Sequence, residues 1–106
     1  MEEYVGRENL ITAQKLEDGI ECLVMGVGNS MTPILKSKQL VRVRPIKDCL
    51  PINKNDIVFA KVNGHFYLHK VSAVKNGKQF QISNNHGHIN GWVTINSIYG
   101  KVVEIL

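Results

Sequence analysis

The stretch DIVFAKVNGHFYLHKVSAV, residues 56–74, decides the fold of this chain. Two runs rich in Val, Ile, Phe and Tyr, Asp56 to Val62 and His65 to Val74, flank the dipeptide Asn63-Gly64. Such residues favour strands, and Asn-Gly between two strand-like runs is a strong signal for a tight hairpin turn. The stretch therefore predicts two antiparallel strands joined by a two-residue turn.

The same pattern continues on both sides of this hairpin. A second Asn-Gly pair, at residues 76–77, predicts another hairpin. Further strands are expected in four other apolar runs: residues 20–27, 40–46, 79–82 and 98–105. Apolar residues at helical spacing predict one short helix from Glu8 to Glu17. We therefore expect an all-β fold, a compact antiparallel β domain in which residues 1–19 form a helical arm and residues 20–106 the β core.

Composition limits the classes of protein to consider. With 106 residues, 43% hydrophobic and 21% charged, the chain fits one ordinary globular domain over residues 1–106. No apolar run approaches the roughly 20 residues that span a bilayer, and the N-terminus is acidic and polar, so a soluble, cytoplasmic protein without a membrane partner is expected. Cys22 and Cys49 lack CxxC spacing, which predicts neither a disulfide framework nor a zinc site.

Charge is divided unevenly along the chain. Residues 1–21 hold six acidic and two basic residues, a net charge of −4. Because the whole chain has a net charge of +4, residues 22–106 carry +8. Basic residues interleaved with aromatic ones could bind single-stranded nucleic acid, but no nucleic-acid signature is present. The acidic arm is the simpler partner for the basic body. Nucleic acid is therefore an unfavoured partner.

The segment around Ser30 is the first candidate for chemistry. A strand runs into a glycine-flanked turn, Gly28-Asn29-Ser30-Met31, with Pro33 shortly after it. Such a bend can expose a serine hydroxyl and leave backbone N–H groups beside it, as a nucleophile with an oxyanion hole requires. Serine is also an ordinary turn and capping residue, so the motif alone favours a structural role for Ser30.

Further boxes occur downstream in the same order as in a known family. Residues 28–35 resemble the Gly-x-Ser-Met-x-Pro-x-Leu box of the signal-peptidase and LexA/UmuD-like serine peptidases (S24/S26). Four later segments resemble other boxes of that family: Asn55 to Ala60 (Gly-Asp-Ile-Val, with Asn55 for glycine), Leu68 to Val71 (the strand of the general base), Ile82 to Asn85 (a degenerate Gly-Asp-Asn-Asn) and Ile98 to Val103 (Ile-x-Gly-Lys-Val-Val). The resemblance covers residues 17–106. It implies that Ser30 is the nucleophile.

The resemblance implies that the general base is His69 or Lys70, and only one of them can face Ser30, because neighbouring strand residues point to opposite faces. Histidine titrates near pH 6.5, so its neutral form is available at pH 7. A lysine would have to lose about three pKa units, or roughly 4 kcal/mol. His69 is favoured, as in the Ser/His branch of the family, and Lys70 is the alternative base. Where the family supplies an orienting aspartate, this chain has Ser83. The apolar residues flanking both positions leave the inward face of the strand undecided.

These residues predict a serine peptidase-like protein that hydrolyses peptide bonds through a Ser/His or Ser/Lys dyad. Catalytic roles are expected for Ser30, His69 and Lys70, and turn or oxyanion roles for Gly28, Asn29 and Met31. No cofactor and no metal is expected, and Asn85-His86-Gly87-His88 is expected to be a flexible loop rather than a zinc site. The partner would be a peptide or protein substrate.

Two alternatives to hydrolysis stay open. One is a non-catalytic interaction module on the same fold, phage or mobile-element encoded, that binds a peptide, a LexA-like partner or itself. The other is single-stranded nucleic-acid binding.

Overall fold

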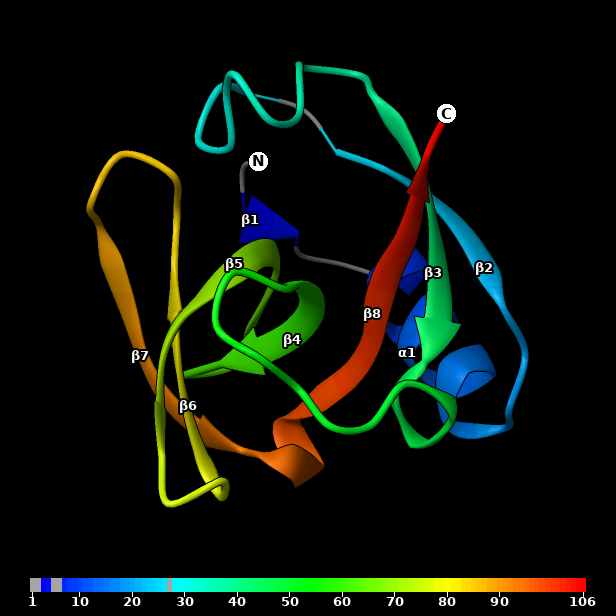
Figure 1. The fold of residues 1–106 in the computed structure, drawn as a ribbon. Helices are drawn as coiled ribbons and strands as arrows, with labels where there is room; N and C mark the ends of the chain where they lie inside the picture. The colour runs from blue at the N-terminus through cyan, green and yellow to red at the C-terminus, as the bar shows by residue number, and fades with distance from the viewer. Residues whose placement is uncertain (1–2, 5–6, 27) are drawn as a thin grey trace.

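The computed structural model describes residues 3–4, 7–26 and 28–106. In these ranges, one helix and eight strands follow one another with two short 3₁₀ turns (Figure 1). In chain order they are β1 (Glu3–Tyr4), α1 (Arg7–Glu17), β2 (Cys22–Met25), β3 (Leu40–Pro45), η1 (Ile46–Asp48), β4 (Ile57–Val62), β5 (His65–Lys75), β6 (Gln79–Ser83), β7 (Ile89–Thr94), η2 (Ile95–Ser97) and β8 (Ile98–Ile105). The all-β prediction with one short N-terminal helix is confirmed.

All strand pairs are antiparallel, and the strands form one curled sheet in the order β2-β3-β8-β4-β5-β6-β7, with β1 paired to β5. Both Asn-Gly hairpins form as predicted. Asn63 and Gly64 have φ of 51° and 85°, and Asn76 and Gly77 have φ of 54° and 68°. Positive φ at both central residues is the geometry of a type I′ turn, whose twist matches that of the flanking strands.

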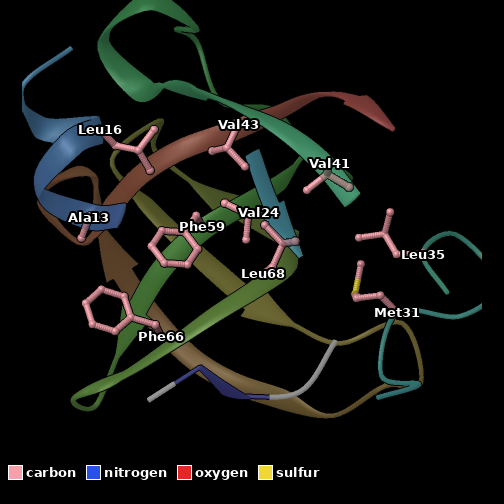
Figure 2. Close-up of a cluster of buried hydrophobic side chains, with 10 residues drawn as sticks. All are labelled: Ala13, Leu16, Val24, Met31, Leu35, Val41, Val43, Phe59, Phe66 and Leu68. Atoms are coloured by element: carbon pink, nitrogen blue, oxygen red, sulfur yellow. The ribbon is translucent and has the colours of Figure 1, made fainter. Parts of the chain in front are cut away.

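Strand β4 and the first half of β5, up to Val71, have buried residues on both faces, which explains their nearly continuous apolar sequence. Phe59, Phe66 and Leu68 contribute to one hydrophobic cluster, shown in Figure 2, while Val58 and Val71 belong to a second one. Helix α1 covers the first cluster with the buried side chains of Ala13 and Leu16 (Figure 2). The two clusters hold β4 and β5 from both sides, so β5 is a rigid support for any residue on it.

Several expectations need correction. The run over residues 20–27 yields the shorter strand β2, and Val27 lies outside the described residues. Strand β7 was not predicted, because its sequence contains Asn90-Gly91 and lacks a clear alternation. Among the aromatic residues that are interleaved with basic ones in the sequence, Phe59, Phe66 and Phe80 are at most 4% exposed, so these three rings are not available for stacking on nucleic-acid bases. Within the described ranges, no helix has the length and apolar character needed to cross a membrane.

Candidate functional site

Ser30 lies in the loop between β2 and β3, which is fixed by its neighbour Met31. The Met31 side chain is fully buried in the first hydrophobic cluster together with Leu35 (Figure 2). Ser30 itself is half-buried and Asn29 is exposed. The alternation of a buried methionine and an accessible serine explains the local sequence. Burial of Met31 anchors the turn and leaves the Ser30 hydroxyl at the surface.

Hydrogen bonds of the residues before and after Ser30 also hold the turn. Gly28 has φ of 96°, in the region that favours glycine, and its N–H donates to Ser37 Oγ at 3.0 Å. Thr32 N–H and Thr32 Oγ1 both donate to the carbonyl oxygen of Asn29, at 3.1 and 2.8 Å. The residues on both sides of Ser30 therefore have defined backbone positions.

His69 meets Ser30 from the middle of β5. Its Nε2 lies 3.2 Å from Ser30 Oγ, and its side chain is 3% exposed. The Tyr67 ring, which packs against the second hydrophobic cluster, lies 4.9 Å from the His69 ring. The 3.2 Å contact between Ser30 and His69 shows that the β5 face with Tyr67, His69 and Val71 is the one that meets Ser30, which the sequence left open.

Asn90 on β7 contacts the other nitrogen of the same imidazole. Its Oδ1 lies 2.7 Å from His69 Nδ1. An amide oxygen only accepts hydrogen bonds, so this bond puts the proton on Nδ1 and turns the lone pair of Nε2 toward Ser30. Asn90 was not among the sequence candidates. The only signal for it would have been the polar residue after the His-rich loop, and that signal is too weak to assign a contact.

Ser83, the expected orienting residue, lies on β6 opposite Lys70 in the strand register and is buried. In the structure it is Asn90 that supplies an oxygen at His69 Nδ1. Lys70 Nζ donates to Asn85 Oδ1 at 3.2 Å, so its ammonium is directed to the loop between β6 and β7. Of the two candidate bases, the structure thus brings His69 to the Ser30 hydroxyl.

The loop over residues 84–88 is an ordered turn. Asn84 Oδ1 accepts from the N–H groups of His86 and His88, and Asn84 N–H donates to the carbonyl oxygen of His88. His86 Nε2 lies 2.9 Å from the carbonyl oxygen of Asn29 and 3.1 Å from Thr32 Oγ1. These hydrogen bonds attach the loop to the serine turn.

The two thiols are weaker nucleophile candidates than the Ser30 pair. Partial burial raises the pKa of Cys22 and of Cys49, and nearby basic residues offset this only in part. Since burial disfavours the thiolate, each cysteine is mainly protonated at neutral pH. The Ser30 hydroxyl, which contacts an imidazole nitrogen at 3.2 Å, is the better candidate.

Comparison with known proteins agrees with the fold and with the order of the sequence boxes. A comparison with curated proteins found no significant match. The family model described as Peptidase S24-like matches residues 3–103 of the chain, which is nearly its whole length. The chain therefore belongs to the Peptidase S24-like family.

Proposed function

We propose that this protein is a serine peptidase in which Ser30 is the nucleophile and His69 the general base. The observation that carries the proposal is the 3.2 Å contact between Ser30 Oγ and His69 Nε2. Membership of a peptidase-like family supports the same reaction class. Asn90, through its contact with Nδ1, is proposed to keep the imidazole in the tautomer that can accept a proton.

In the proposed reaction, Ser30 Oγ attacks the carbonyl carbon of a peptide bond while its proton moves to His69 Nε2. The carbonyl oxygen becomes an oxyanion, and the backbone N–H of Ser30 is proposed to stabilise it. His69 then gives its proton to the leaving amine, the C–N bond breaks, and an acyl group remains on Ser30. A water molecule, deprotonated by His69, attacks the ester, which releases the carboxylic acid and restores the Ser30 hydroxyl.

Covalent labelling by a fluorophosphonate probe tests this proposal without knowledge of the substrate. An activated serine attacks the phosphorus and releases fluoride, and intact-protein mass spectrometry detects the adduct. We expect one adduct on Ser30, and none in Ser30→Ala or His69→Ala. Ser97→Ala, in the η2 turn, is the matched control and should label like the wild type.

The fold must survive the key substitution for this result to be meaningful. Ser30 is half-buried, so loss of its hydroxyl should change the free energy of unfolding by no more than about 0.5 to 1 kcal/mol. Equal labelling of Ser30→Ala and wild type, or no labelling of the wild type, would contradict the proposal. A non-catalytic interaction module on the same fold would then be the better account.

A further inference from the structure

The loop between β6 and β7 holds the serine turn through hydrogen bonds. Asn85 makes two hydrogen bonds to that turn. Its backbone N–H donates to the carbonyl oxygen of Ser30 at 2.7 Å, and its Nδ2 donates to the carbonyl oxygen of Thr32 at 2.9 Å. Met31, the residue between these two carbonyls, is fully buried. The turn is thus fixed at three consecutive residues.

These contacts fix the peptide groups next to the nucleophile. A peptide unit is planar and trans, so holding the carbonyl oxygen of Ser30 also sets the direction of the following Met31 N–H. The hydrogen bond to the Thr32 carbonyl oxygen fixes the backbone position at the C-terminal end of the same short segment. The direction of the Ser30 side chain depends on the backbone that carries it, so Asn85 controls where Oγ stands relative to His69.

Lys70 determines which way the Asn85 amide faces. An ammonium group has only donors, so Lys70 Nζ, 3.2 Å away, requires the amide oxygen Oδ1 on its side. With Oδ1 directed to Lys70, Nδ2 is left to donate to Thr32. Removal of the ammonium would allow the amide to rotate, which would replace an attractive contact with Thr32 by an oxygen facing an oxygen.

We propose that Lys70 and Asn85 act together as positioning residues for Ser30, and that this is the role of Lys70 beside the general base. The inference rests on the proposed function. It gives two adjacent β5 residues different roles at the same nucleophile. His69 contacts Ser30 Oγ directly, and Lys70 acts on the backbone of Ser30 through Asn85.

The test compares the rate of fluorophosphonate labelling in four variants of the full chain. Lys70→Met and Asn85→Ala should each label about 10- to 100-fold more slowly than the wild type, because a displaced nucleophile loses its alignment. Lys70→Arg keeps a cationic donor and should stay within about threefold of the wild type. Lys78→Met, at an exposed lysine in the β5–β6 hairpin, is the charge-matched control and should not differ from the wild type.

The double variant Lys70→Met/Asn85→Ala distinguishes positioning from other roles. If Lys70 acts through Asn85, the double variant should be no slower than the slower single one, because the two losses are not additive. Additive losses, or a Lys70→Arg variant as slow as Lys70→Met, would overturn the inference. The second result would instead indicate that Lys70 is the base.

A readout that does not depend on activity separates this inference from the proposed function. The backbone N–H of Asn85 donates to the Ser30 carbonyl oxygen. The hydrogen exchange of this backbone proton, followed by NMR, therefore reports whether the turn is held. We expect at least about tenfold faster exchange in Lys70→Met than in Lys78→Met. Unchanged exchange would overturn the inference even if the wild type labels. Absence of labelling in the wild type would overturn only the peptidase proposal, and the exchange result would then decide the role of Lys70.

Discussion

Asn90 Oδ1 and His69 Nδ1 lie 2.7 Å apart, although 21 residues separate them in the chain. The contact exists because β6 runs back along β5 and β7 runs back along β6, so that the start of β7 lies near the middle of β5. A neutral amide fixes the imidazole tautomer without adding a charge. The site therefore resembles a Ser-His-Asp triad in geometry, with an amide where the carboxylate would stand.

Replacement of that amide by a carboxylate should make Ser30 more reactive. A charge-assisted hydrogen bond is about twice as strong as a neutral one and stabilises the imidazolium that forms during attack. We expect Asn90→Asp to label with fluorophosphonate about tenfold faster, which corresponds to about 1.4 kcal/mol of barrier. Asn90→Leu should label at least about tenfold more slowly.

Ser83→Ala is the control for this pair, because Ser83 is the residue that the sequence pattern assigns to the orienting role. It is buried opposite Lys70, and we expect its labelling rate to stay within about threefold of the wild type, provided that circular dichroism shows an intact sheet. A larger loss in Ser83→Ala than in Asn90→Leu would return the orienting role to Ser83.

The pH dependence of labelling should identify the general base. Protonated histidine cannot accept the Ser30 proton, so a His69 base predicts a rate that is low while the imidazole is protonated in acid, rises as it is deprotonated and then levels off. Asn90→Asp should move this rise to higher pH, because a nearby carboxylate stabilises the imidazolium. The measurement is the labelling rate from pH 5 to 10, and a rate that still rises steeply above pH 9 would indicate a lysine base.

Local chemistry explains which parts of this structure the sequence could predict. The hairpins at Asn63-Gly64 and Asn76-Gly77 were predictable because the turn geometry depends on the two residues themselves. The proximity of Ser30 to His69 on β5 followed from the family boxes. Asn90 could not be found in this way, because its contact depends on register shifts that occur in both the β5–β6 and the β6–β7 pairs.

Asn55, which replaces a glycine of the family box, shows how the same physics explains a departure from the pattern. Its φ is 77°, in the left-handed region that glycine and asparagine tolerate best. We expect Asn55→Gly to change the free energy of unfolding by less than about 0.5 kcal/mol, and Asn55→Val to cost about 1 to 2 kcal/mol. Urea denaturation of the two variants measures the difference, and equal midpoints for glycine and valine would contradict this account.

Any side chain at Gly100 in β8 should destabilise the fold, because β8 and its neighbour β3 lie very close together at this position. A Cβ at this position would lie 2.6 Å from Val43 Cγ1 and 2.7 Å from the carbonyl oxygen of Arg44. The contact with Val43 involves a side chain, but the contact with Arg44 involves backbone that is paired in the sheet. Gly100→Ala should therefore lower the free energy of unfolding by about 1 to 3 kcal/mol. In the Val43→Ala background the same substitution should cost less, yet still a measurable amount, since the Arg44 carbonyl stays in place. Thermal unfolding of the four proteins of this cycle gives the comparison, and a cost that vanishes completely with Val43→Ala would show that the backbone contact contributes nothing.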